Sequence, residues 1–285
     1  MLVLKNALGI LFLALLAPEW VHATPGDAPG NGEVKRFIGC PVYRDTDSGR
    51  KSGCWLVTDT QSGLRFDLQQ AFTKPQLGQE ILVEGYLPES AKRSAADCGG
   101  WVLERVRVSV LPGSCPATWL PAEDFPGRRF EVPASAMTPN HLPQPQPPQP
   151  WVTREFQIFF DFGNDYLRYQ HAEVILQEAV RLAQLGGARN IRITGYAATA
   201  PVDVSGRLLR EPVPLAKARA QMVTEALVRL GWPRSKIIAR SDTHPVSLPD
   251  VPAEHVQASL RRVTLLVEIG NERKVKTGRS IQKPH

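Results

Sequence analysis

The chain has 285 residues, of which 42% are hydrophobic and 22% are charged, and its formal net charge is +6. This length exceeds the usual size of one domain and favours two domains over a single core. A basic chain could bind nucleic acid, but residues 271–285 alone hold five lysines and arginines against one glutamate, a balance of +4. The excess charge therefore belongs mostly to a basic tail, and it does not favour nucleic acid as a partner.

The first 23 residues have the pattern of a secretory signal peptide. Lys5 precedes an apolar run over residues 7–17, and Val21-His22-Ala23 forms a cleavage site before Thr24. The run is shorter than the roughly 18 to 20 apolar residues of a transmembrane helix, and no other stretch approaches that length. The first cysteine is Cys40, so a lipoprotein anchor is not expected. We predict an exported mature chain without a transmembrane segment.

Residues 32–121 alternate short runs of strand-forming residues with turn residues. Five short strands of this kind favour an all-β domain built as a small barrel. The predicted strands cover residues 34–40, 54–58, 64–68, 80–87 and 101–110. The last two resemble the late strands of an OB-fold, so an OB-like barrel is expected.

OB-folds often bind oligosaccharides or single-stranded nucleic acid through aromatic and basic residues on the barrel face. The candidates in this domain are Tyr43, Trp55, Arg65, Phe66 and Trp101. Each could instead be barrel core or cover a disulfide, which is the favoured interpretation for a tryptophan directly after a cysteine. Exposure of Tyr43 and Trp55 on one face would favour the barrel as a ligand module, and burial would argue against it.

Four cysteines lie in the first half of the chain, which in an exported protein indicates two disulfides. They are Cys40, Cys54, Cys98 and Cys115. Three pairings are possible, and the preferred one closes two short loops, Cys40 with Cys54 and Cys98 with Cys115. A zinc site is the rival interpretation. It is disfavoured because the cysteines are not paired two residues apart and no histidine lies near them.

The segment 122–150 predicts a linker between two domains. Residues 139–150 alternate proline with glutamine, and such a stretch cannot form a helix or a central strand. We expect an extended, semi-rigid spacer here. The second domain would then cover residues 151–270, followed by the basic tail 271–285.

Residues 151–270 predict the element order strand, helix, strand, helix, strand, strand. The strands are expected over residues 155–162, 190–196, 236–240 and 261–269. Apolar stripes predict helices over residues 172–183 and 215–230, and glycines follow both of them as stop signals. Strand-helix-strand units favour a sheet with helices packed on its faces, so this domain is expected to be α+β.

Arg219 lies beside the apolar stripe of the second helix, one turn from Leu215 and from Val223. A charge next to a buried stripe needs an anionic partner. The partner could belong to this chain, for example Asp161 or Glu268, or it could be a ligand. The sequence leaves both possibilities open.

The run Leu215–Val223 resembles the helix signature Leu-Ser-x-x-Arg-Ala-x-x-Val of the OmpA-like peptidoglycan-binding domain. The strands at 155–162, 190–196 and 261–269 also resemble the opening, second and closing strands of that family. The resemblance implies a β-α-β-α-β-β sandwich in which Arg219 grips a carboxylate of the peptidoglycan stem peptide. It also implies that Arg262 helps to position the binding loop. Tyr196, at the end of the second strand, could pack against the ligand or be ordinary half-buried packing.

The chain departs from the family pattern after the second strand. Where the family has an aspartate that pairs with the ligand's ammonium group, this chain has Ala198, and Pro212 replaces the usual asparagine before the helix. Alanine cannot accept a hydrogen bond from an ammonium group, so half of the expected clamp is missing. Asp203, in the long loop 199–214, could replace the lost carboxylate. The alternative is that Asp203 is a solvated turn residue.

No nucleophile, base and orienting group form a constellation, and the histidines lack ligand spacing, so neither an enzyme nor a metal or cofactor site is expected. The leading hypothesis is a periplasmic cell-envelope protein that binds peptidoglycan and tethers an OB-like module, which engages another envelope component. The residues expected to bind peptidoglycan are Arg219, Arg262, Tyr196 and Asp203. The alternative is a degenerate OmpA-like scaffold that acts as a protein-interaction adaptor in an envelope or secretion complex, without glycan binding. A third hypothesis makes the barrel the main ligand module.

Overall fold

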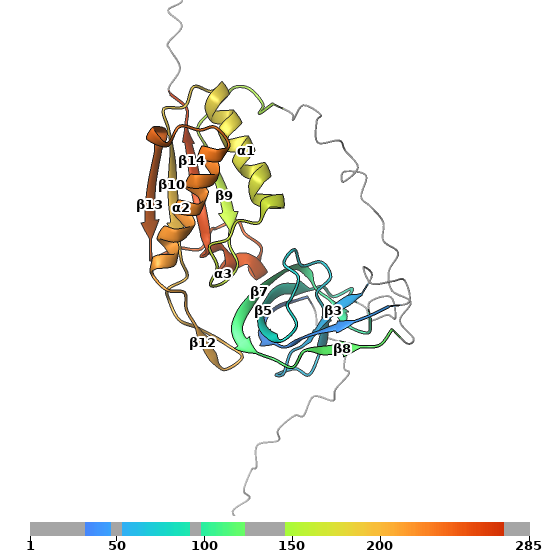
Figure 1. Ribbon diagram of the computed structural model, residues 1–285. Coiled ribbons are helices and arrows are strands. Elements are labelled where there is room, and N and C mark those ends of the chain that lie inside the picture. The colour runs from blue at the N-terminus through green and yellow to red at the C-terminus, as the bar shows by residue number, and fades with distance from the viewer. Residues whose placement is uncertain (1–31, 47–52, 92–97, 123–145, 271–285) are drawn as a thin grey trace, which may run out of the picture.

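The structure, a computed structural model, describes residues 32–46, 53–91, 98–122 and 146–270 (Figure 1). The predicted signal peptide 1–23, the basic tail 271–285 and most of the predicted linker 122–150 lie outside the described residues. Within the described part of the chain, no helix is long and apolar enough to cross a membrane. Two bodies are visible, a strand-rich N-terminal domain and a C-terminal domain with two long helices.

The strands of the N-terminal domain form two sheets. The first is antiparallel in the order β1 (Glu33–Gly39), β5 (Gln79–Leu87), β7 (Glu104–Ser114). The second has the order β6 (Trp101–Val102), β4 (Arg65–Asp67), β3 (Cys54–Thr58), β2 (Pro41–Arg44), β8 (Thr118–Leu120). The all-β expectation is confirmed, but the OB-like barrel is not, because the strands do not form one closed sheet.

The two sheets enclose one apolar core. Alternating side chains of both sheets point inward, among them Phe37, Phe66, Ile81, Val83 and Val108, each at most 2% exposed. The sheets also share two runs of the chain. Only Cys40 separates β1 from β2, and only Leu103 separates β6 from β7. The domain is therefore held together by its core and by two strands that pass from one sheet to the other.

Two disulfides are present, but the predicted pairing was wrong. Cys40 bonds to Cys115, and Cys54 bonds to Cys98. Cys40 directly follows β1 and Cys115 directly follows β7, and these two strands flank β5 on either side. Their Cα atoms are 5.6 Å apart, so sheet order rather than sequence spacing decides the partner.

The C-terminal domain has the predicted α+β architecture. Its sheet has the order β13 (Ile237–Asp242), β10 (Asn190–Tyr196), β14 (Arg262–Glu268), β9 (Arg154–Phe159), with only the β10–β13 pair parallel. Helix α1 (Tyr169–Leu185) lies over β9 and β14, and α2 (Pro214–Arg229) lies over β10 and β13 (Figure 1). Short 3-10 turns cover Arg234–Lys236 and Ala253–His255, and the latter leads into α3 (Val256–Ser259).

The connection from β10 to α2 contains a hairpin that the sequence did not predict. Strands β11 (Val202–Val204) and β12 (Arg207–Leu209) pair antiparallel and reach the N-terminal domain (Figure 1). Val204 and Leu209 of this hairpin are buried against Ile38, Leu82 and Leu111 of the N-terminal sheet. The hairpin therefore belongs to the contact between the two domains.

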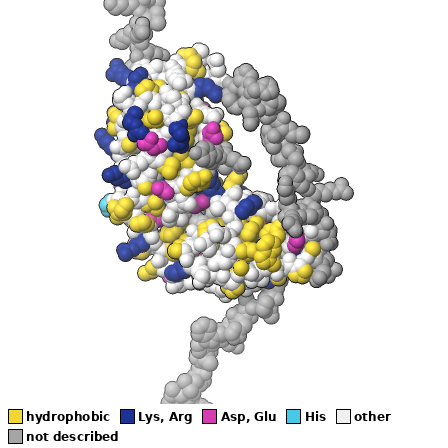
Figure 2. Space-filling view, in the orientation of Figure 1, with side chains coloured by type: hydrophobic (Ala, Val, Ile, Leu, Met, Phe, Trp, Pro, Cys, Tyr) yellow, Lys and Arg dark blue, Asp and Glu magenta, His cyan; other side chains and the backbone are white. Residues whose placement is uncertain are grey.

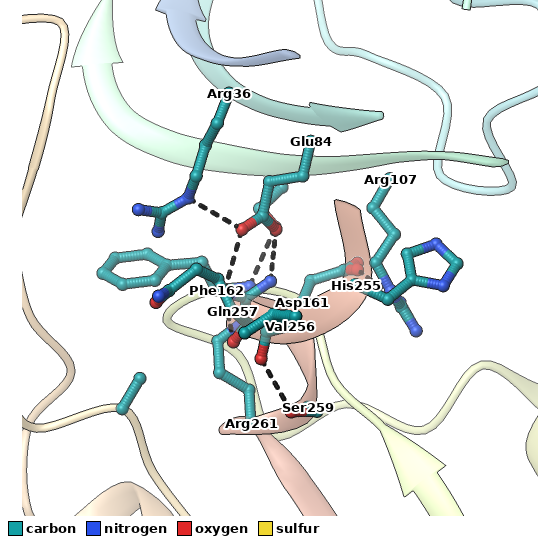
Figure 3. A network of polar contacts seen from close by, with 12 residues as sticks. Arg36, Glu84, Arg107, Asp161, Phe162, His255, Val256, Gln257, Ser259 and Arg261 are labelled. Carbon is teal, nitrogen blue, oxygen red and sulfur yellow. Dashed lines mark hydrogen bonds and ion pairs between the residues drawn. The ribbon is translucent and has the colours of Figure 1, made fainter. Parts of the chain in front are cut away.

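A buried charge network also joins the domains (Figure 3). Glu84 of β5 accepts hydrogen bonds from Arg36 of β1 and from Arg261, which directly precedes β14. The side chains of Glu84 and Arg261 are 2% and 1% exposed. Burial alone would raise the pKa of Glu84, but Arg261 and Arg36 outweigh it and hold that pKa below its usual value. The carboxylate is therefore charged at neutral pH and bound from both domains.

Candidate functional site

Arg219 reaches the end of the sheet because α2 lies unusually close to β10. The closest approach is at Gly195, where a Cβ atom would lie only 2.1 Å from the carbonyl oxygen of Ala216 and 3.0 Å from the Cβ of Ala220. Glycine is thus required for this packing. Pro214 begins the helix at a position where its missing N–H is not needed. These features place the guanidinium of Arg219 at the carboxyl end of β10.

Every donor of the Arg219 guanidinium has an acceptor. Its two Nη atoms donate to the two carboxylate oxygens of Glu211, at 2.8 and 2.6 Å. The remaining donors reach the backbone carbonyls of Asn164, Tyr196 and Asp161, at 2.9, 2.8 and 3.2 Å. The side chains of Arg219 and Glu211 are both 0% exposed. The pair is therefore a fully buried, bidentate ion pair.

The Glu211 carboxylate is satisfied just as completely. Besides Arg219, it accepts hydrogen bonds from the backbone N–H groups of Gly163 and Ala198, both at 2.8 Å. Each carboxylate oxygen thus accepts two hydrogen bonds. An arginine fork with two backbone N–H groups is the arrangement that binds a free carboxylate. Here a carboxylate of the same chain fills it.

The hairpin β11–β12 brings Glu211 to this place. Its turn has positive φ angles at Ser205 and Gly206, and the Ser205 hydroxyl accepts a hydrogen bond from the Ile38 backbone N–H at 3.1 Å. After β12 the chain returns to the end of β10, where the Glu211 N–H donates to the Ala198 carbonyl at 2.8 Å. The N-terminal domain therefore helps to hold the segment that closes the arginine site.

Asp203 does not replace the carboxylate that the family has at position 198. It lies exposed on the hairpin, and its Oδ1 accepts a hydrogen bond from the Gly206 N–H at 3.2 Å. This is the turn role that the sequence offered as the alternative. The partner of Arg219 was also not among the two acids named from the sequence, since Asp161 pairs with Arg168 and Glu268 pairs with Arg192.

Tyr196 and Arg262 lie next to this closed site. The guanidinium of Arg262 stacks on the Tyr196 ring at 4.2 Å, and its Nη1 donates to the carbonyls of Val246 and Ser259 at 3.0 and 2.6 Å. Tyr196 also contributes its carbonyl to Arg219. Three of the four predicted residues are thus brought together, and Asp203 stands apart from them.

Glu211 was the functional residue that sequence reasoning missed. One signal could have found it, because Glu211 is the only acidic residue between Asp203 and Glu225. A buried Arg219 supplied from this helix needs an acid from a nearby connection, and no other was available there. Within the described residues, no group of three or more histidine, cysteine or acidic side chains could hold a metal ion.

Comparison with known proteins supports the family resemblance of the C-terminal part. Residues 159–259 match the model of the OmpA family. A search of curated proteins found no match.

Solved structures with a similar fold include three OmpA-like proteins. The OmpA-like domain of FopA1 from Francisella tularensis subsp. tularensis SCHU S4 is 18% identical, with a TM-score of 0.33 over 40% of this chain and 71% of that chain. The peptidoglycan-associated lipoprotein from Burkholderia pseudomallei is 22% identical, with a TM-score of 0.32 over 39% and 89%. The cell wall anchor of the T6SS from Pseudomonas aeruginosa is 20% identical, with a TM-score of 0.32 over 41% and 82%. Likeness at this level says nothing about function.

Proposed function

We propose that this chain is a cell-envelope adaptor, in which the OmpA-like domain serves as a scaffold and does not bind peptidoglycan through Arg219. The observation that carries the proposal is the buried ion pair between Arg219 and Glu211. The OmpA family match, the pattern of a signal peptide at residues 1–23 and the two disulfides all favour an exported, envelope-associated protein.

An incoming stem-peptide carboxylate would have to displace Glu211. Removing one partner of a buried ion pair costs about 3–5 kcal/mol. Glu211 is also tethered to the site by its own chain, so it competes at a high effective concentration. The hairpin that carries it is packed against Ile38 and Leu82 of the N-terminal domain. A weak, free ligand is therefore at a disadvantage.

An aromatic cluster on the N-terminal domain offers a surface for a protein partner. Tyr43 stands between Trp55 and Trp119, with ring centroids 5.1 and 4.9 Å apart in edge-to-face arrangements. Trp119 is 65% exposed, and Tyr43 and Trp55 are half-buried. Apolar side chains gather at this part of the domain, near β3 and β8 (Figure 2). Aromatic residues of this kind are enriched at the centres of protein interfaces.

The proposal extends to the fold of the N-terminal domain, which we interpret as an opened OB-like barrel. The one-residue junctions at Cys40 and Leu103 make β1–β2 and β6–β7 two long, bent strands. The parallel pair of β4 with β6 then connects the two sheets through the second of these strands. On this interpretation, the aromatic cluster lies on the outer surface of the barrel module.

Peptidoglycan binding is the second candidate, and the chemistry of the arginine site favours it. Arg219 with the N–H groups of Gly163 and Ala198 would suit a ligand carboxylate if Glu211 moved away. Tyr196 and Arg262 would then border the ligand. Under this candidate, Asp203 could contribute only if the hairpin rearranged.

Co-sedimentation with isolated peptidoglycan sacculi separates the two candidates. The adaptor proposal expects the folded wild-type mature chain to stay in the supernatant. Pelleting that is lost in the double variant Arg219→Gln with Glu211→Gln would instead establish peptidoglycan binding. The double variant is used because it leaves no unpaired buried charge. Arg192→Gln, at an arginine that is half exposed and pairs with Glu268, is the matched control.

Photo-crosslinking in cells tests the adaptor role directly. A benzoylphenylalanine at position 119 is expected to give one dominant protein adduct. The same residue at position 174, where Val174 is 62% exposed on α1, is the control and should not give that adduct. Identical adduct patterns at both positions would contradict a partner surface at the aromatic cluster.

A further inference from the structure

A cavity of about 550 Å³ lies between the two domains, on the far side of the domain contact from the hairpin. It is bordered by β7 of the N-terminal domain and by β9 and the start of α1 of the C-terminal domain. Its volume is within the range of roughly 300–1,000 Å³ that is typical of small-molecule sites. Most of its wall is apolar, and Phe72, Leu167 and Ile175 contribute to it.

Two arginines line the cavity and share a single acid. Arg168 pairs with Asp161, whereas Arg107 Nη1 lies 3.8 Å from the other oxygen of the same carboxylate. That separation exceeds hydrogen-bond length. Among the described residues, the guanidinium of Arg107 donates no hydrogen bond. Figure 3 shows Arg107 extending from the N-terminal domain toward His255 of the other domain.

The surroundings leave this pair of arginines short of negative charge. Burial, then the neighbouring Arg261, lower the pKa of Arg107 to about 10. Burial, then Arg107, lower the pKa of Arg168 to about 10. Both arginines nevertheless stay protonated at neutral pH, because that value is well above 7. The nearest other acid, Glu84, already serves Arg36 and Arg261.

A third arginine at the cavity, Arg105, is already neutralised. It pairs with Glu254 and stacks on the Tyr86 ring at 4.6 Å. The unmet charge is therefore confined to the end of the cavity where Arg107 and Arg168 lie. The side chains of these two arginines are 21% and 26% exposed, so a small molecule can reach them.

We propose that this cavity binds a single-chain amphipathic anion, a long-chain carboxylate. Its head group would bind Arg107 and Arg168, and its hydrocarbon chain would lie along Phe72, Leu167 and Ile175. A carboxylate would supply the acceptor that Arg107 lacks and the charge that Asp161 alone cannot provide. The apolar wall would bury the chain, which favours binding in proportion to the area removed from water.

Calorimetric titration of the mature chain with decanoate, below its micelle concentration, tests this site. We expect saturable binding of one decanoate per chain. Decanol and decyltrimethylammonium, which keep the chain but lack the negative head, should bind roughly tenfold more weakly or worse, because a charge-assisted hydrogen bond is lost. Inorganic phosphate, which lacks the chain, should also bind weakly.

Variants locate the binding on the structure. Arg107→Gln should weaken decanoate binding by roughly tenfold or more. Phe72→Ser should weaken it through the apolar wall, and Phe72 is 63% exposed, so the fold should tolerate the change. Arg192→Gln removes a surface arginine far from the cavity and should leave the affinity unchanged. Near-ultraviolet circular dichroism checks that each variant is folded.

Three results would overturn the proposal. The first is an absence of saturable decanoate binding to the folded wild-type chain. The second is decanol binding as tightly as decanoate, which would remove the anion site. The third is an unchanged affinity in folded Arg107→Gln, which would place the ligand elsewhere.

Discussion

Arg219 and Arg261 are both buried arginines that bind a glutamate, yet their surroundings differ. Arg219 and Glu211 lie within the C-terminal domain, and three backbone carbonyls and two backbone N–H groups complete their hydrogen bonds. Arg261 instead reaches across the domain boundary to Glu84, which is shared with Arg36 (Figure 3). The first ion pair closes a pocket, and the second joins two domains.

The difference shows what decides the role of a buried arginine. Both guanidiniums need a carboxylate, because a buried charge without a partner is costly. The path of the chain decides which carboxylate arrives. At Arg219 it is the hairpin β11–β12, and at Arg261 it is the sheet of the other domain. The predictions below separate the two pairs by stability, acid sensitivity and hydrogen-bond strength.

Glu211→Ala is expected to have the largest effect. It leaves Arg219 buried without a carboxylate and takes acceptors away from two backbone N–H groups. We expect a loss of about 3–5 kcal/mol in the free energy of unfolding. Urea denaturation followed by tryptophan fluorescence would measure it. A loss below about 1 kcal/mol would mean that water reaches Arg219, which contradicts its burial.

The double variant Arg219→Met with Glu211→Met sharpens this result. Replacing a simple buried ion pair with apolar residues is often neutral. Here, however, the carbonyls of Asp161, Asn164 and Tyr196 would lose their donor. We therefore expect the double variant to stay about 2 kcal/mol less stable than the wild type, since unsatisfied buried groups cost about 1–3 kcal/mol each. Recovery to wild-type stability would show that the backbone contacts contribute little.

Glu84→Gln tests the pair between the domains. The amide keeps the shape but loses the charge, and we expect a loss of about 2 kcal/mol at pH 7, within the range for charge-assisted hydrogen bonds. Because the folded pKa of Glu84 lies below its usual 4.5, this stability is present above that value and is lost as the pH falls toward the folded pKa. The wild type should therefore lose more stability than Glu84→Gln below pH 4.5. Parallel acid profiles would contradict the role of this carboxylate.

Arg36→Gln should have a smaller effect at the same network. Arg36 is 18% exposed and makes one hydrogen bond to Glu84, at 3.0 Å, while Arg261 remains bound to the carboxylate. We expect a loss of about 1 kcal/mol. Urea denaturation of Arg36→Gln beside Glu84→Gln would order the two contributions. A loss as large as that of Glu84→Gln would mean that Arg36, rather than Arg261, holds the carboxylate.

The contrast between the two pairs also marks how far the sequence could predict this molecule. The C-terminal strands and helices were predictable because each carries a regular apolar pattern, and the need of Arg219 for an acid followed from its place beside a stripe. The hairpin β11–β12 was not, since its strands have three residues each and lack alternation. Without that hairpin, nothing in the pattern led from Arg219 to Glu211.

The N-terminal domain shows the same limit for long-range pairing. Strands β2 and β8 were missed because they are short and gain stability only from their neighbours. The disulfide partners depend on which strands flank β5, and the spacing of the cysteines contains no such information. Local periodicity therefore predicts elements well, while contacts between distant segments determine the site.

Asp203→Ala is expected to have the smallest effect and separates the two acids of the hairpin. Asp203 is exposed and only caps the turn through Gly206, so we expect a loss of about 0.5 kcal/mol or less, as for most surface substitutions. Urea denaturation beside Glu211→Ala would measure the contrast. A loss comparable to that of Glu211→Ala would mean that the turn itself positions Glu211. The closure of the arginine site would then depend on the rigidity of the hairpin as much as on the ion pair.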